Sequence, residues 1–217
     1  MKIALIGATG FVGSKILEET LNRKHAVTAI VRNPEKLSLK HSLLTVVKGD
    51  VFNEQELTTL LKGHDVIVSA YNPGWSNPNI YDDFIKGTTT IQQATKNAGV
   101  KRFIVIGGAG SLYIAPGVQL IDTPEFPAEI KPGASAARDY LETIKQETEL
   151  DWTFFSPAIE MHQGTAGIRR GIYRTGLEHP VFDENGRSIL SVEDVAVVIA
   201  DEIENKQFVN KRFTAAY

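Results

Sequence analysis

The sequence predicts an α/β fold in which a doubly wound parallel sheet carries helices on both faces. Strands rich in Val, Ile and Leu alternate with helical patterns through the first two thirds of the chain, which is typical of parallel sheets covered on both sides. The first strand also runs directly into glycines at positions 7, 10 and 13, and an amphipathic helix follows at once. At 217 residues and 42% hydrophobic residues, the chain fits one domain with a full-sized core, over residues 1–217.

The elements are expected from local residue patterns. Apolar runs bounded by turn residues predict strands, and apolar residues spaced three and four apart predict helices. We expect strands at 2–6, Ala26–Val31, Leu43–Val47, Asp65–Ala70, Arg102–Ile106 and Trp152–Phe155. We expect helices near 11–22, 54–62, 80–98, 135–149 and 191–204.

The glycine loop between the first strand and the first helix predicts a dinucleotide site. Gly7 allows a sharp turn, Gly10 allows the backbone to approach a pyrophosphate, and Gly13 allows the helix to lie close to the sheet. The helix N-terminus would then hold the pyrophosphate. The candidate contacts are Gly7, Thr9, Gly10, Phe11, Val12 and Gly13. The alternative is a glycine-rich turn in a protein without a cofactor.

The end of the second strand indicates which cofactor is preferred. NAD-selective sites place Asp or Glu there to bind the ribose hydroxyls, whereas this chain has Arg32. A guanidinium can pair with a 2′-phosphate through two parallel hydrogen bonds. We therefore expect NADP, with NAD as the second possibility. The alternative is that Arg32 is a solvent-exposed residue at a strand end.

Residues after the third and fourth strands are further candidates. Asp50 can accept a hydrogen bond from the adenine amino group while Val51 packs on the ring, or Asp50 simply turns the chain into the next helix. Ala70 is small enough for the nicotinamide-side ribose to approach the backbone. Tyr71 either walls the site or fills the core.

Two long segments interrupt the alternation, near 107–133 and 157–187, and both are rich in turn residues. Each follows a strand, so each should emerge at the carboxyl edge of the sheet, where ligands bind in this architecture. Their aromatic and aliphatic residues favour ordered lids over disordered loops. We interpret them as a small substrate lobe built from loops.

The sequence resembles known families at several motifs. The glycine spacing, Gly49-Asp50-Val51 and Ser156-Pro157-Ala158 resemble the atypical and extended short-chain dehydrogenase/reductases. A narrower resemblance covers nearly the whole chain and points to the bacterial NADH-flavin reductase family, which is related to NAD-dependent epimerases and nitrogen-metabolite-repression regulators. The segments that carry it are Gly107–Leu112, Asp122–Pro127, Asp151–Ala158 and Arg212–Tyr217. The resemblance implies a Rossmann-like fold, an NAD(P) cofactor, and cofactor contacts from Ser156 and Pro157.

The usual catalytic pair of short-chain dehydrogenases is missing. That pair is a Tyr and a Lys four positions apart, so that the lysine lowers the pKa of the phenol. Here the nearest pair is Tyr140 and Lys145, five apart, and we interpret Tyr140 as a packing residue. Ser111 follows the fifth strand and is the candidate catalytic residue, able to donate a hydrogen bond to a substrate oxygen or a flavin nitrogen. It can equally be an ordinary loop serine.

Composition excludes several other functions. The chain has no cysteine and its five histidines show no ligand spacing, so we predict no metal site. The net charge of −3 gives no case for nucleic acid or membrane binding. The first residues enter a core strand directly, so we expect a cytoplasmic protein with no signal peptide. No prediction is made for the oligomeric state.

These observations predict an NADPH-dependent oxidoreductase that passes hydride to a small conjugated molecule. Flavin is the expected acceptor, as a substrate and not as a tightly bound group. Hydride on a flavin leaves charge spread over the ring, so no strong protein acid is needed. A redox sensor that binds NADP without turnover is one alternative, and a sugar epimerase or dehydratase is another.

Overall fold

The computed structural model describes all residues from 1 to 217. Its central sheet has eight strands in the order β3-β2-β1-β4-β5-β8-β10-β9, and β9 alone is antiparallel to its neighbour. The strands are β1 (Lys2–Ile6), β2 (Ala26–Val31), β3 (Leu44–Lys48), β4 (Val66–Ser69), β5 (Arg102–Ile106), β8 (Asp151–Ser156), β9 (Arg174–Gly176) and β10 (Lys211–Ala216). The six strands predicted from the sequence are therefore confirmed, with ends that differ by at most one residue.

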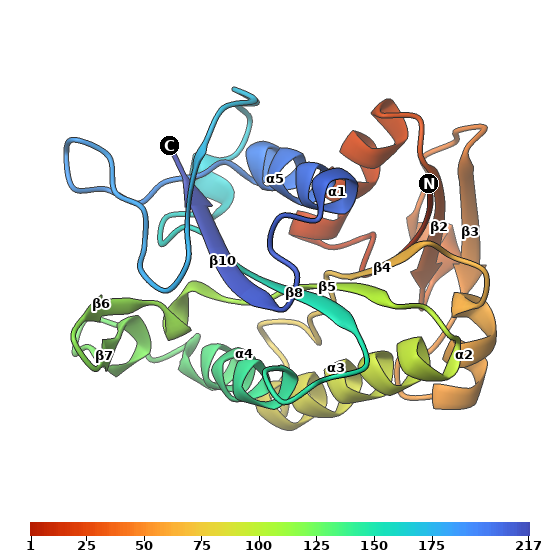
Figure 1. Ribbon diagram of the computed structural model, residues 1–217, viewed down its shortest axis with the longest axis horizontal. Coiled ribbons are helices and arrows are strands. Elements are labelled where there is room, and N and C mark those ends of the chain that lie inside the picture. The colour runs from red at the N-terminus through yellow and green to blue at the C-terminus, as the bar shows by residue number, and fades with distance from the viewer.

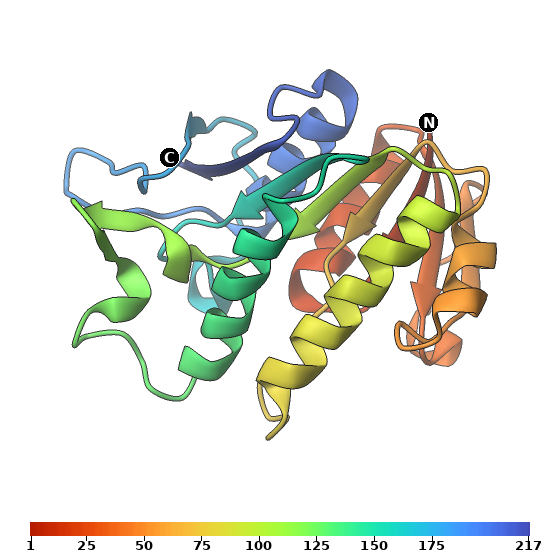
Figure 2. The ribbon, with the colours of Figure 1, turned by 60° about the horizontal axis from the view of Figure 1, so that its bottom comes forward.

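Helices cover both faces of the sheet, which confirms the doubly wound α/β fold (Figure 1). One face carries α1 (Phe11–Asn22) and α5 (Val192–Asn205), which pack against each other. The other face carries α2 (Glu54–Leu61), α3 (Ile80–Asn97) and α4 (Lys131–Ile144). In Figure 2, α3 and α4 run side by side across this second face. None of the helices combines the length and the apolar character that crossing a membrane requires.

The two faces divide the core into two clusters. In β1, Ile3 and Leu5 belong to a cluster of 24 buried residues on the α1 and α5 side, whereas Ala4 and Ile6 belong to a cluster of 22 on the other side. Successive side chains of a strand point to opposite faces, so a strand covered on both sides needs apolar residues at every position. This explains why the strands read as continuous apolar runs.

Several elements differ from the sequence predictions. The strand β10 was not predicted, because Lys211, Ala215 and Ala216, half of its residues, are of types that are depleted in strands. The edge strand β9 and the hairpin β6–β7 (Tyr113–Ala115 and Val118–Gln119) are too short to give a periodic signal. The helix expected near 135–149 runs from Lys131 to Ile144, with Pro132 in its first turn, where proline costs nothing.

The two long segments, 107–133 and 157–187, follow β5 and β8 and so leave the sheet at its carboxyl edge. The first contains the hairpin β6–β7 and two short 3-10 helices, and the second contains one such helix (Gln163–Thr165) and β9. Figures 1 and 2 place both at the same end of the molecule, beyond β8 and β10 and far from β3.

Candidate nucleotide and acceptor site

The glycine loop has the geometry that its spacing predicts. Gly7 has a φ of +86°, and a Cβ atom there would lie 2.4 Å from the carbonyl oxygen of Ala70. A Cβ atom on Gly13 would lie 2.1 Å from the carbonyl oxygen of Gly7. Real Cβ atoms do not approach backbone this closely, so α1 can pack against the loop only with glycine at position 13.

The N-terminus of α1 is open to an anion. Gly10 caps the helix without a side chain, and no acidic residue stands in the first turn. The backbone N–H groups of Phe11, Val12 and Gly13 have no acceptor within the protein. Thr9, Gly10 and Phe11 are exposed, so a ligand can reach these donors. The unpaired N–H groups and the missing side chain at Gly10 fit the pyrophosphate of a dinucleotide.

The residues at the ends of β2 and β3 lie on the same edge as the glycine loop. Arg32 is exposed and forms no ion pair with the protein, so its guanidinium is available to a phosphate. Asp50 is also exposed, and its Oδ1 accepts the backbone N–H of Phe52 at 3.0 Å. Asp50 therefore does turn the chain toward α2, while its second carboxylate oxygen remains free. Val51 is buried, which limits the ring surface that it can offer to adenine.

Tyr71 fills the core beside the site. Its side chain is buried against Gly87 of α3, and its hydroxyl donates to the backbone carbonyl of Asp83 at 3.1 Å. Burial, followed by the charge of Asp83, raises the pKa of Tyr71 to about 12, so the phenol stays protonated at neutral pH. The half-buried Ala70 and the backbone nitrogen of Tyr71 border Gly7. The backbone of Tyr71 therefore borders the glycine loop while its ring packs in the core, and the cofactor contact predicted for Tyr71 stays a prediction.

Ser156, Pro157 and Ser111 close the carboxyl edge at β8 and β5. All three are buried. The hydroxyl of Ser111 lies 3.4 Å from Nη1 of Arg212, which also donates to the carbonyl oxygen of Ser111 at 3.3 Å. An arginine can only donate, so the Ser111 oxygen is the acceptor and its own proton remains available. The roles predicted for these residues stay predictions.

Arg212 was not predicted as a site residue, although its guanidinium contacts Ser111 at this edge. Its side chain projects from β10 and is 1% exposed, and besides Ser111 it is paired with Glu178 of the 157–187 segment. The signal was faint, because one arginine near the end of the chain normally belongs to a solvated surface. Because β10 was not predicted, the sequence also gave no sign that Arg212 and Phe213 point to opposite faces of the sheet.

Tyr140 has a structural position. Its side chain is fully buried in α4, and its hydroxyl donates to Oε1 of Gln92 at 2.8 Å. Complete burial raises the pKa of Tyr140 well above the usual value. The phenol does not face the carboxyl edge as a proton donor, which agrees with its interpretation as a packing residue.

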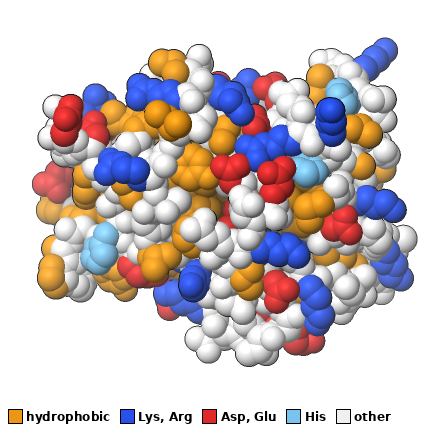
Figure 3. Space-filling model, turned by 45° about the horizontal axis from the view of Figure 1, so that its top comes forward, with side chains coloured by type: hydrophobic (Ala, Val, Ile, Leu, Met, Phe, Trp, Pro, Cys, Tyr) orange, Lys and Arg blue, Asp and Glu red, His pale blue; other side chains and the backbone are white.

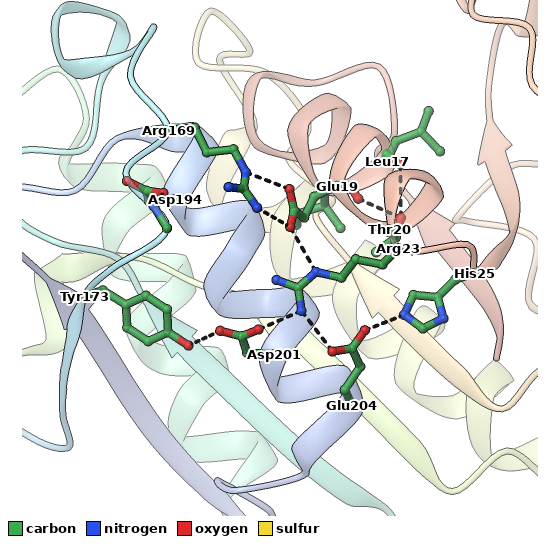
Figure 4. A network of polar contacts seen from close by, with 12 residues as sticks. Leu17, Glu19, Thr20, Arg23, His25, Arg169, Tyr173, Asp194, Asp201 and Glu204 are labelled. Carbon is green, nitrogen blue, oxygen red and sulfur yellow. Dashed lines mark hydrogen bonds and ion pairs between the residues drawn. The ribbon is translucent and has the colours of Figure 1, made fainter.

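Ion pairs fix the 157–187 segment to the helices α1 and α5 (Figure 4). Arg169 donates two hydrogen bonds to Glu19 of α1, at 2.8 and 3.0 Å, and Glu19 also accepts from Arg23 at 2.9 Å. Arg23 and Tyr173 both bind Asp201 of α5. Hydrogen bonds from Arg169, and then from Arg23, hold the pKa of Glu19 below its usual value even though burial opposes this.

The start of α5 provides a second anchor. Ser191 caps the helix by accepting the N–H of Asp194 at 3.1 Å. The carboxylate of Asp194 accepts the backbone N–H groups of Arg170 and Gly171 at 2.9 and 2.8 Å. Asp194 therefore holds the 157–187 segment in place.

On the surface in Figure 3, acidic and basic side chains are interspersed without a large patch of one sign.

The fold and the open glycine loop define a Rossmann-like nucleotide-binding protein, and comparisons give its family. The chain belongs to the NAD(P)H-binding family, whose model matches residues 7–206. The uncharacterized protein YwnB of Bacillus subtilis is 36% identical over 217 residues, covering 99% of this chain and 97% of its own.

Two solved structures are similar over their whole length. One, from Bacteroides thetaiotaomicron, is described as a "putative epimerase" and has a TM-score of 0.92 and 46% identity, covering 100% of this chain and 96% of that chain. The other, from Streptococcus pneumoniae, is described as a "putative NADH-flavin reductase" and has a TM-score of 0.82 and 35% identity, covering 100% and 99%. The resemblance found in the sequence is confirmed, as is an NAD(P)-binding fold of the oxidoreductase type.

Proposed function

We propose that this protein is an NADPH-dependent reductase that passes hydride to a flat, conjugated acceptor, with a flavin as the preferred substrate. The observation that carries the proposal is the burial of Tyr140, whose hydroxyl is bound to Gln92. An isolated ketone concentrates negative charge on one oxygen when it takes hydride, so it needs a positioned acid. A conjugated ring spreads that charge, and a solvent proton suffices.

The residues divide into those that bind the cofactor and those that face the acceptor. The free N–H groups of Phe11, Val12 and Gly13 hold the pyrophosphate, and Arg32 binds the 2′-phosphate. Asp50 and Val51 border the adenine, while Ala70, Tyr71, Ser156 and Pro157 border the nicotinamide-side ribose. A bound nicotinamide supplies the hydride. The chain then contributes orientation and exclusion of water.

Ser111 is the residue proposed to touch the acceptor. Its oxygen accepts from Arg212, so its proton can be donated to an acceptor oxygen or nitrogen. The segments 107–133 and 157–187 cover the acceptor as a small lobe of one domain spanning residues 1–217. The cytoplasmic location expected from the sequence stays a prediction.

Steady-state oxidation of NADPH with a panel of acceptors tests the proposal. We expect turnover with free flavins or quinones and none with simple alcohols or ketones. Ser111→Ala should slow flavin reduction by up to roughly tenfold, the cost of one neutral hydrogen bond of about 0.5–1.5 kcal/mol. NADPH binding without turnover of any conjugated acceptor would favour a sensor instead, and efficient turnover of a sugar nucleotide would favour an epimerase.

A further inference from the structure

Three buried polar side chains share one small area of the sheet. Arg212 and Thr214 are two residues apart in β10, so they point to the same face. Thr214 pairs in register with Ser156 of β8, and Arg212 pairs with Phe154, which packs on the α3 and α4 side. The three polar side chains therefore lie on the same face of β8 and β10, and Nη1 of Arg212 reaches Ser111 in the 107–112 turn.

Each of these side chains has a buried polar atom without a partner in the protein. The atoms are Nε of Arg212, Oγ of Ser156 and Oγ1 of Thr214. Only one other buried side-chain atom, Nε of Arg102, shares this property, and it belongs to a separate ion pair with Glu202. Burying a polar group without a hydrogen bond costs free energy, so three such groups side by side suggest a site that binds something.

The one counter-charge at this site comes from the 157–187 segment. Glu178 is paired with Arg212 through its carboxylate, and its backbone carbonyl accepts from Nη2 of Arg212 at 3.4 Å. The Glu178 side chain is 44% exposed, whereas that of Arg212 is 1% exposed. Glu178 follows β9, a three-residue strand at the edge of the sheet, and its departure would open the guanidinium to the outside.

We propose that Arg212, with the hydroxyls of Ser111, Ser156 and Thr214, forms a subsite for a carboxylate of the acceptor, and that Glu178 fills it when no acceptor is bound. This rests on the proposed function and extends its substrate class to conjugated acceptors that carry a carboxylate; a flavin has no carboxylate and would leave Glu178 in place. One guanidinium binds one carboxylate through its planar fork, and the exchange of one carboxylate for another leaves the net charge unchanged. A phosphate dianion would leave one negative charge without a partner.

Binding of a planar carboxylate and its neutral amide, naphthoate and naphthamide, tests the subsite without any turnover. Glu178→Gln removes the competing charge but keeps the shape of the side chain. We expect naphthoate to bind this variant at least about tenfold tighter than the parent protein, with naphthamide unchanged within about twofold, by calorimetry. Glu184→Gln is the matched control, because Glu184 is an exposed glutamate of the same segment and forms no ion pair. It should change neither affinity.

The double variant Glu178→Gln/Arg212→Met removes both charges together, so no unpaired charge stays buried. It should lose the preference for naphthoate. If Glu178→Gln does not fold, Glu178→Asp takes its place. It shortens the side chain and keeps its charge, so its affinity for naphthoate should be above that of the parent and below that expected for Glu178→Gln. Equal affinities for naphthoate and naphthamide in both Glu178 variants would overturn the subsite, as would an unchanged preference in the double variant. Flavin reduction by the parent protein, measured separately, decides the proposed function whatever the result.

Discussion

The cofactor side and the acceptor side of the carboxyl edge are built from different parts of the chain. On the cofactor side, backbone forms the site: glycines remove side chains and leave the N–H groups of the first turn of α1 free. On the acceptor side, side chains form it, above all Arg212 with Glu178, and the pair of Arg169 with Glu19 anchors the covering segment to α1. The first site stays open, whereas the second is held closed by its own ion pairs.

The difference teaches where specificity can reside. A backbone site recognises what all dinucleotides share, the pyrophosphate, and we propose that Arg32 at its rim distinguishes one cofactor from another. A side-chain site can change its ligand through one substitution. The acceptor side should therefore tolerate mutation with a change of substrate, whereas mutation of the glycine loop should weaken the binding of any dinucleotide.

Gly13→Ala should disrupt the cofactor side more than any other substitution considered. The new Cβ atom would meet the carbonyl oxygen of Gly7 at 2.1 Å, and backbone cannot move aside as a flexible side chain can. We expect the free energy of unfolding to fall by about 3 kcal/mol, the upper end of the cost of overpacking, with loss of NADPH binding. Urea denaturation and calorimetric titration measure the two effects.

Gly10→Ala is the matched control for this prediction. Its Cβ atom would lie 3.3 Å from the same oxygen, a tight but tolerable contact. Stability should change by less than about 0.5 kcal/mol, while the added methyl group blocks the pyrophosphate and weakens NADPH binding roughly tenfold or more. If Gly10→Ala is as unstable as Gly13→Ala, the two glycines do not have the separate roles assigned here.

The same contrast explains how far the sequence could be interpreted. The glycine loop is local, within seven residues, and its glycine spacing is enough to predict its geometry. The acceptor side depends on pairs far apart in the chain, such as Arg212 with Ser111, separated by 101 residues, and Arg169 with Glu19, separated by 150. A single sequence carries no signal for such pairs. Strand β10, which supplies Arg212, was also missed because three of its six residues are Lys or Ala, types that are depleted in strands.

Arg32→Asp tests whether the rim of the cofactor site sets the preference for NADPH. Arg32 has no partner in the protein, so its replacement should cost little stability. The loss of a charge-assisted contact of roughly 1.5–3 kcal/mol should reverse the order of affinities, so that NADH binds tighter than NADPH. Titration of the parent protein with both cofactors is the reference. Equal affinities in the parent would contradict the role given to Arg32.

Glu19→Gln tests the ion pairs that hold the acceptor side to α1. Glu19 is nearly buried and Arg169 is half exposed, so we expect a loss of about 1–2 kcal/mol in the free energy of unfolding. The exposed pair of Lys15 and Glu18 on the same helix is the control, and Glu18→Gln should cost less than about 0.5 kcal/mol. Similar losses for both variants would mean that Arg169 does not anchor the segment.

The pKa of Glu19 gives this prediction a pH dependence. Arg169 and then Arg23 lower the folded-state pKa below the unfolded value, so the stabilisation is complete above the unfolded pKa and is lost as pH falls through the folded one. Between about pH 5 and pH 3, the parent should therefore lose more stability than Glu19→Gln. Parallel losses in the two proteins would show that the carboxylate of Glu19 contributes nothing in this range.

Tyr140→Phe should have the smallest effect on the reaction, because Tyr140 belongs to the core and to neither the cofactor side nor the acceptor side. Its hydroxyl bonds only Gln92, away from the carboxyl edge, so flavin reduction should stay within a factor of a few. Loss of this buried hydrogen bond should still cost about 1 kcal/mol of stability, which urea denaturation measures independently. A hundredfold fall in turnover, the usual scale for a positioned acid, would restore the dehydrogenase mechanism. The acceptor would then be a carbonyl compound, because only such a substrate needs the proton that Tyr140 would supply.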